Sequence, residues 1–314
     1  MPEWLIERGI GETRAALIDN GEVVEARIEL DCGHAGTVVA ARLVDSGLNG
    51  RNSVARDESG VEYLLPRGAP NAAEGALINV EVTRGAIPGA EPWKRPLARV
   101  TEENPREARR LSGRELTFSS PADELGRAGW NDLIDEARSG IVRFEGGELR
   151  VSVTPAMTLM DVDGYLEAGE LAERGAREAA RAIRRLDIGG SIGIDLPTSG
   201  SKAARQAAAA AIDEHLPQPF ERTAVNGFGF LQVVRPRSRA SLIELAQDRA
   251  AFEARALLRR AAFEAPGPKR LVAHPMVIAA LEAQADWTAA LSRQAGGAVS
   301  LRADAALPMS GGYA

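Results

Sequence analysis

The stretch from Thr158 to Pro197, TLMDVDGYLEAGELAERGAREAARAIRRLDIGGSIGIDLP, decides the fold of this chain. An apolar run ends at Asp161, a segment with helical spacing follows, and a second apolar run, Ile192 to Ile194, ends at Asp195. This order predicts a strand, a helix and another strand. A right-handed crossover lays two such strands parallel, with their carboxyl ends at one edge of a sheet. We therefore expect Asp161 and Asp195 to face the same crevice.

The middle of this stretch has the spacing of an amphipathic helix. Small and aliphatic residues recur every three or four positions, at Ala172, Ala176, Ala179, Ile183 and Leu186. Acidic residues open the segment and arginines close it, which complements the helix dipole. Gly189 then provides a stop signal.

Two carboxylates that share one crevice repel each other unless a cation lies between them. Mg2+ suits such a site, because it takes oxygen ligands and needs few protein donors. Asp163 faces the same side as Asp161 and could hold a metal-bound water. The alternative interpretation is that each aspartate only caps a neighbouring helix or turn.

A calcium loop is a weaker interpretation of the same residues. With Gly164 at the sixth position, Asp161, Asp163 and Glu170 would occupy the third, fifth and twelfth positions. The first ligand would then be Leu159, whose side chain has no oxygen. The three histidines are dispersed along the chain and lack metal-ligand spacing.

The composition indicates a globular chain of two or three domains, with 314 residues, 45% hydrophobic and 26% charged. A net charge of -6 and 4% aromatic residues disfavour nucleic-acid binding through a wholly basic surface or many stacking platforms, but permit a local basic channel. The single cysteine excludes a disulfide framework and a Cys-rich zinc site within one chain. No apolar segment approaches the roughly 20 residues that span a bilayer, and no signal pattern opens the chain, so we expect a cytoplasmic protein without a membrane partner.

The first hundred residues predict two β-rich units. Three runs, Trp4 to Ile6, Thr13 to Ile18 and Val23 to Leu30, predict a small antiparallel sheet. Short strands with Gly-rich turns then follow up to about Thr83, which is typical of a small barrel such as an OB-fold. The cluster Trp93-Lys94-Arg95 could bind a phosphate chain with a base stacked on the ring, or could be a solvated loop.

The remaining chain alternates helices and strands. We expect a linker over 101–114, a helix over 121–139, a hairpin over 142–153 and a helix over 201–216. A strand carrying Asn226-Gly227-Phe228-Gly229 runs into Arg235, Arg237 and Arg239, whose spacing on an extended segment would make a rail for phosphates or a solubilising edge strand. One long helix is expected over 242–262, then a small α/β unit with a disordered tail over 307–314.

Four segments, in order, carry a resemblance to a known family. They are GETRAALIDNGEVVEARIE from position 11, TLMDVDG from position 158, RRLDIGGSIGIDLP from position 184 and VNGFGFLQVVRPRSRASL from position 225. Together they resemble the catalytic half of the ribonuclease E/G family of bacterial endoribonucleases. The agreement covers most of the chain and is most specific in Asp161 to Asp195 and Val225 to Leu242.

The resemblance implies an α+β multidomain architecture. A split RNase H-like domain, over 1–32 and 115–150, would surround an OB-fold RNA-binding domain over 33–100. A linker over 101–114, a deoxyribonuclease I-like α/β catalytic domain over 151–241 and a small C-terminal α/β domain over 242–314 would complete it. By resemblance, Asp161 and Asp195 match the family's Mg2+-binding aspartates. Asp163 stands where the family usually has an asparagine that positions the site, and Lys94 roughly matches a basic OB-fold residue near the RNA.

The departures from the family pattern indicate a compact member. The family's 5′-phosphate sensing domain has almost no room between Val100 and Ala122. The zinc-linking Cys-Pro-x-Cys motif is missing after Leu242, so no zinc-linked tetramer is expected. The RNA-facing aromatic positions of the family's OB-fold are occupied here by Val54 and approximately by Tyr63-Leu64.

The expected function is therefore Mg2+-dependent cleavage of single-stranded RNA, in RNA processing or decay, by a metal-activated water. The family precedent implies 5′-phosphate and 3′-hydroxyl products. Catalytic residues would be Asp161, Asp195 and Asp163, with RNA contacts from Trp93, Lys94, Arg95, Asn226, Phe228, Arg235, Arg237 and Arg239. The alternative is a non-catalytic RNA-binding protein that retains the fold. The carboxylate pair favours the nuclease, because it carries a repulsive cost that only a metal relieves.

Overall fold

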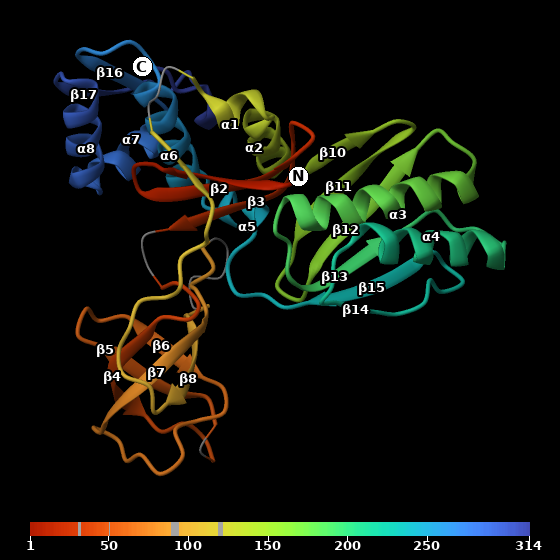
Figure 1. Ribbon diagram of the computed structural model, residues 1–314, viewed down its shortest axis with the longest axis horizontal. Coiled ribbons are helices and arrows are strands. Elements are labelled where there is room, and N and C mark those ends of the chain that lie inside the picture. The colour runs from red at the N-terminus through yellow and green to blue at the C-terminus, as the bar shows by residue number, and fades with distance from the viewer. Residues whose placement is uncertain (31–32, 50, 89–93, 119–121) are drawn as a thin grey trace.

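The computed structural model describes residues 1–30, 33–49, 51–88, 94–118 and 122–314. These residues form a mixed α/β protein with a four-stranded sheet, a six-stranded sheet, a two-stranded sheet and a closed five-stranded barrel. Figure 1 shows the barrel set apart from the other elements, which pack together. The predicted small barrel and the mixture of helices and strands are confirmed.

The four-stranded sheet opens the chain, as the three apolar runs predict. Its strands are β1 (Glu3–Arg8), β2 (Glu12–Asp19), β3 (Glu22–Leu30) and β9 (Arg114–Leu116), in the order β3-β2-β1-β9. The β2–β3 hairpin turns at Asn20 and Gly21, both of which have positive φ angles, 51° and 86°. That conformation twists a two-residue turn to match its strands.

The barrel is inserted between β3 and β9. It consists of β4 (Val38–Asp45), β5 (Ser53–Asp57), β6 (Glu62–Leu65), β7 (Leu77–Arg84) and β8 (Leu97–Thr101), in the order β4-β5-β6-β8-β7. Its small core includes Leu43, Leu65 and Val80, which are almost fully buried. The chain then returns along the barrel, where Arg106 and Val38 exchange two backbone hydrogen bonds of 2.9 and 3.0 Å.

The six-stranded sheet holds the stretch that decides the fold. Its strands are β10 (Ile141–Phe144), β11 (Gly147–Val153), β12 (Thr158–Gly164), β13 (Gly190–Asp195), β14 (Glu221–Arg222) and β15 (Phe230–Arg235), in the order β10-β11-β12-β13-β15-β14. The hairpin β10–β11 pairs with β12. The predicted division at 150/151 is therefore wrong, because it cuts through strands of one sheet.

Helices cover one face of this sheet. The predicted crossover helix is α3 (Ala168–Arg185), and α4 (Lys202–His215) packs beside it (Figure 1). A Cβ atom at Gly175 would collide with Val162, so this glycine lets α3 approach β12 closely. The five residues of the predicted helical stripe are all buried. The opposite face of the sheet is left open along β12, whose Leu159, Asp161 and Asp163 are exposed.

The four-stranded and six-stranded sheets share one hydrophobic core. The short α1 (Glu124–Arg127) and α2 (Trp130–Ser139) lie between them in the chain. Leu5 and Ile28 from the first sheet join the same cluster as Trp130 of α2 and Ile183 of α3. The two sheets therefore form one body to which the barrel is attached.

The C-terminal unit differs from its prediction in two ways. It contains α5 (Leu242–Leu245), α6 (Arg249–Ala262), β16 (Lys269–Ala273), α7 (Pro275–Glu282), α8 (Ala285–Ala295), β17 (Val299–Ala303) and the 3-10 turn η1 (Met309–Gly311). The single long helix is wrong, because Asp248 caps a new helix by accepting a hydrogen bond from the Ala251 amide. The disordered tail is also wrong, because Tyr313 and Val272 exchange two backbone hydrogen bonds of 2.8 and 3.0 Å.

A buried network of charges joins α6 to the four-stranded sheet. Its ion pairs are Arg14–Glu7 at 2.8 Å, Arg14–Glu12 at 2.5 Å, Arg255–Glu12 at 2.8 Å, Arg259–Glu7 at 2.9 Å and Arg259–Asp123 at 2.6 Å. Burial acts to lower the pKa of Arg259, but hydrogen bonds to Asp123 and Glu7 outweigh it and raise that pKa. The carboxylates and guanidinium groups neutralise one another, which is the condition for burying charge.

We predict that Arg259→Leu lowers the free energy of unfolding by about 3–5 kcal/mol, because it removes one of the two guanidinium groups that pair with the buried Glu7 carboxylate and also the partner of Asp123. Denaturant unfolding followed by circular dichroism measures this loss. The control is Arg302→Ala, which removes an exposed arginine of β17 and should change the stability by less than about 0.5 kcal/mol. Equal losses in the two variants would show that the network contributes nothing specific.

Candidate active site

Asp161 and Asp195 lie side by side on two parallel strands, Asp195 at the carboxyl end of β13 and Asp161 in the middle of β12. Asp161 of β12 is in register with Asp195 of β13, and the preceding pair is Met160 with Ile194. Met160 and Ile194 are fully buried beneath the helices. Since successive side chains of a strand point to opposite faces, both aspartates point to the open face of the sheet. The predicted parallel arrangement is confirmed, with the carboxylates on an open face of the sheet.

The two carboxylates interact electrostatically. The pKa of Asp161 is raised above its ordinary value, first by loss of hydration and then by the negative charges of Asp163 and Asp195. Arg150 and the backbone amide of Val162 act in the opposite direction without cancelling the effect. Loss of hydration and the two neighbouring carboxylates together therefore disfavour the ionised form of Asp161.

Asp163 and the adjacent strand β11 flank the pair. Asp163 is opposite Glu148 in the antiparallel register, and Arg150 is opposite Asp161. Arg150 forms an ion pair of 2.8 Å with Glu148. The guanidinium group opposite Asp161 is therefore already paired with another carboxylate. The expectation that Asp163 shares the face of Asp161 agrees with the exposure of both residues.

The donor set suits a hard divalent cation. Within the described residues, no group of three or more His, Cys, Asp or Glu side chains is placed to hold a metal. A cation would therefore be held by the two carboxylates of Asp161 and Asp195, with water in its other positions. Mg2+ is bound in this way in many proteins, because it retains several waters.

Gly193 shapes the surface beside the carboxylates. A Cβ atom at this position would lie 2.7 Å from the Phe230 ring, 2.9 Å from Leu159 and 3.0 Å from Met157. The missing side chain lets these three apolar groups close over the strand. They form an apolar floor next to Asp195, which is in register with Phe230.

An exposed aromatic residue adjoins the end of β13. The Asn226 side chain accepts hydrogen bonds from the amides of Phe228 and Phe230, at 2.9 and 3.1 Å. The Phe228 carbonyl accepts a hydrogen bond of 2.9 Å from the Thr198 hydroxyl. The Phe228 side chain is 81% exposed. Asn226 thus positions the loop, and the exposed Phe228 lies two residues before Phe230, which is in register with Asp195.

Sequence reasoning missed a second exposed aromatic residue, Tyr165, which follows directly after β12 and is 84% exposed. Its place one residue after Gly164 at the end of an acidic strand is a signal that could have identified it. Tyr165 follows the end of β12, and the loop of Phe228 adjoins the end of β13. These are the two strands that carry the aspartates.

The three predicted arginines lie away from the carboxylates. Asp195 is in register with Phe230 and Gly190 with Arg235, so the two ends of β15 are roughly 17 Å apart. The strand ends at Arg235, so Arg237 and Arg239 do not continue it as the expected rail. That geometric expectation is wrong.

Each of these arginines contacts its own partner. Arg235 donates to the carbonyls of Ile183 and Ile188, at 3.5 and 3.2 Å. Arg237 pairs with Glu244. Arg239 pairs with Asp187 at 2.8 Å. Their first role in this structure is to join the end of β15 to α3 and α5.

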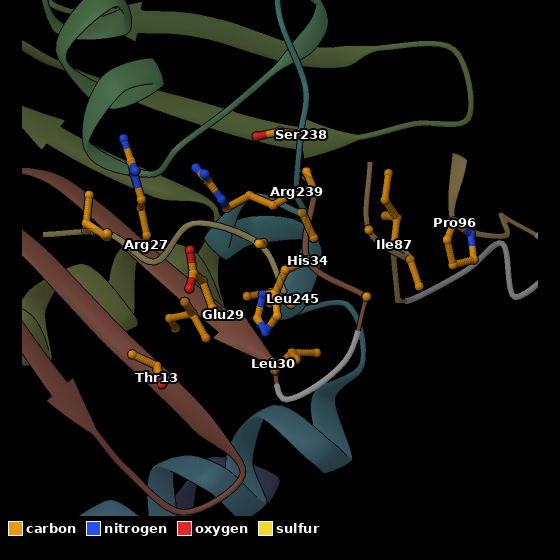
Figure 2. A pocket seen from close by; sticks show the side chains of 18 of the residues that line it. Thr13, Arg27, Glu29, Leu30, His34, Ile87, Pro96, Ser238, Arg239 and Leu245 are labelled. Atoms are coloured by element: carbon orange, nitrogen blue, oxygen red, sulfur yellow. The ribbon is translucent and has the colours of Figure 1, made fainter. Parts of the chain in front are cut away.

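Lys94 and Arg95, the described residues of the predicted basic cluster, do not form one surface with the carboxylate pair. Lys94, Arg95 and Arg239 line a cavity of about 1440 Å³ between the barrel and the four-stranded sheet (Figure 2). Arg95 also pairs with Glu62 at 2.8 Å. Trp93 lies outside the described residues. Of the predicted RNA-binding residues, Lys94, Arg95 and Arg239 thus line this cavity, and Asn226 and Phe228 lie near the end of β13. Arg235 and Arg237 are in neither place.

No protein-family model matches this chain, and no curated protein matches its sequence. Among the described residues, none of the helices is both long enough and apolar enough to cross a membrane. The arrangement of side chains therefore carries the functional argument.

We predict that Asp161→Asn raises the melting temperature of the metal-free protein at pH 7. The folded-state pKa of Asp161 is raised, so its ionised form costs stability at pH 7, and that cost disappears as the pH falls through the folded-state pKa. The difference between variant and wild type should therefore shrink toward acidic pH. Mg2+ should stabilise the wild type and have less effect on the variant.

Thermal unfolding with EDTA or Mg2+, between pH 4 and 8, measures both effects. The control is Glu58→Gln, which neutralises an exposed carboxylate of the barrel. A lower melting temperature for Asp161→Asn at pH 7 would mean that the carboxylate is a structural cap.

Proposed function

We propose that this chain is a metal-dependent endoribonuclease of the ribonuclease E/G type that cleaves single-stranded RNA. The observation that carries the proposal is the pair Asp161 and Asp195, in register on parallel strands and both exposed on the open face of the sheet. We further propose the domain types that the resemblance implies. The four-stranded sheet would belong to an RNase H-like domain, the barrel would be an OB-fold, and the six-stranded sheet would be deoxyribonuclease I-like.

The chain would supply binding and orientation at this site. Bound Mg2+ would polarise a phosphodiester and lower the pKa of a water molecule. Asp161 and Asp195 would bind the cation, and Asp163 would orient a water through a hydrogen bond. Attack of the water oxygen on phosphorus would form a new P–O bond and break the bond to the 3′ oxygen. The water would lose a proton to solvent and the 3′ oxygen would take one up, which leaves a 5′-phosphate and a 3′-hydroxyl.

The exposed Phe228 ring gives the site a contact for single-stranded substrate. Every base has a π-face that can stack on an aromatic ring, so such a contact tolerates many sequences. A paired strand would hide those faces. The ring next to Asp195 therefore favours RNA whose bases are unstacked.

A non-catalytic RNA-binding protein is the second candidate. The position of the barrel favours it, because the barrel lies apart from the six-stranded sheet that carries the aspartates (Figure 1). Arg235, Arg237 and Arg239, which would guide a phosphate chain, contact internal partners instead.

We predict that the purified protein makes internal cuts in an end-labelled, A/U-rich single-stranded RNA only in the presence of Mg2+. EDTA should prevent cleavage, and so should Asp195→Asn, because one carboxylate cannot hold the cation alone. Circular dichroism checks that this variant folds, and Glu58→Gln serves as an active control. Intact RNA with reduced gel mobility in every sample would establish the binding protein instead.

We predict that Phe228→Ala weakens RNA binding about 5- to 150-fold, since stacking on an aromatic side chain contributes about 1–3 kcal/mol per base. Fluorescence anisotropy with an RNA decamer in EDTA measures this change without cleavage. The fold should be unaffected, because Phe228 is exposed and its loop is held by backbone contacts. Met276→Ala, an exposed residue of α7, is the control, and equal affinities of the two variants would contradict a stacking role.

A further inference from the structure

The cavity between the barrel and the four-stranded sheet is a second candidate binding site. The sheet, the barrel residues 85–88 and 94–96, the connection 107–112 and the loop 238–240 surround it. A backbone hydrogen bond of 3.1 Å from the Gly85 amide to the Ser238 carbonyl joins the barrel to that loop. Its volume of about 1440 Å³ exceeds that of most small-molecule sites.

Several cations line the cavity although the whole chain carries a net charge of -6. Seven lysine and arginine residues and four carboxylates line it. Arg8, Arg27, Arg95 and Arg239 each pair with a carboxylate, at 2.6 to 2.8 Å. Arg109 and Arg110 are exposed and have no ion pair with the described part of the chain. Their positive charges are available to an anion.

The walls differ in chemistry. Ile87 and Pro96, both buried, form an apolar wall on the barrel side, and Figure 2 shows Arg27 and Arg239 on the other side. Arg27 also lies over the Trp4 ring, 4.6 Å from its centroid. A ligand that fits here has an anionic part and a flat apolar part.

We propose that this cavity binds a nucleoside phosphate. Arg109 and Arg110 contact the phosphate, and the base lies against Ile87 and Pro96. The ligand is either a free nucleotide or one nucleotide of an RNA strand, since both present the same groups. Because Arg239 lies beyond the end of β15 opposite Phe230, this site is separate from the carboxylate pair and does not depend on its activity.

Calorimetric titration with ADP tests the proposal, in EDTA and on the Asp195→Asn protein, so that no cleavage intervenes. The double variant Arg109→Ala/Arg110→Ala should weaken ADP binding by about tenfold or more, because two charges close to the phosphate are removed. The control Arg270→Ala/Arg302→Ala removes two exposed arginines of β16 and β17 and should leave the affinity unchanged.

A second variant keeps every cation in place. Ala86→Glu introduces a carboxylate at an exposed position of the cavity lining and should abolish ADP binding by repulsion. Ala73→Glu, at an exposed barrel position outside the lining, should bind ADP as the parent does. The absence of ADP binding to the parent protein, or equal loss in the cavity variants and their controls, would overturn the proposal.

Competition experiments distinguish the parts of the ligand. Adenosine and inorganic phosphate should each displace ADP only weakly, and phosphate as effective as ADP would overturn the nucleoside part of the proposal. Displacement by an RNA decamer would identify a nucleotide within a strand, and lack of displacement would identify a free nucleotide. ADP binding that persists in a protein without ribonuclease activity would leave this site standing while the proposed reaction fails.

Discussion

The buried ion pairs between the four-stranded sheet and α6 constrain the rest of the structure. Arg255 and Glu12 are 243 positions apart in the chain, and Arg259 and Glu7 are 252 positions apart. Removing one partner from a buried pair leaves an uncompensated charge, which costs several kcal/mol. The N-terminal sheet and α6 can therefore meet in only one arrangement. This contact fixes the position of α6 against the N-terminal sheet. The short helix α5, which precedes α6 in the chain, packs into the core that the two sheets share.

The carboxylate pair on the six-stranded sheet shows the opposite balance of charge. Burial acts to raise the pKa of Asp123, but the hydrogen bond from Arg259 and other contacts outweigh it and lower that pKa. At Asp161, burial and the neighbouring aspartates raise the pKa, and Arg150 only partly opposes them. The protein thus supplies a cation to the half-buried carboxylate of Asp123, whereas the contacts of Asp161 on the open sheet face do not offset the effects that raise its pKa. This difference is the physical basis for the proposed metal site.

Arg109 and Arg110, which have no ion pair with the described part of the chain, line the cavity between the barrel and the four-stranded sheet. The two regions lie toward opposite ends of β15, whose Phe230 adjoins the carboxylates and whose Arg235 begins the path to Arg239. A bound RNA strand that reached both would run along the molecule from the barrel to the open sheet face. Because of this separation, the nucleotide binding that we propose for the cavity would not depend on events at the carboxylates.

The sequence by itself determined the local elements and one long-range feature. Apolar periodicity and turn residues predict three of the four strands of the first sheet, the helix α3 and the β10–β11 hairpin, because these signals act over a few residues. The strand β9, which pairs with β1, was not predicted. The parallel placement of Asp161 and Asp195 also follows from the sequence, since a strand, helix and strand of this length connect in one way. The helix break at Asp248 could have been recognised from its capping side chain.

Only the tertiary structure decided which sheet the hairpin joins, that the tail pairs with Val272, and that Arg237 and Arg239 bind Glu244 and Asp187. The choice of partner for a strand edge or a guanidinium group depends on residues far away in the chain, and the spacing of neighbours carries no information about them.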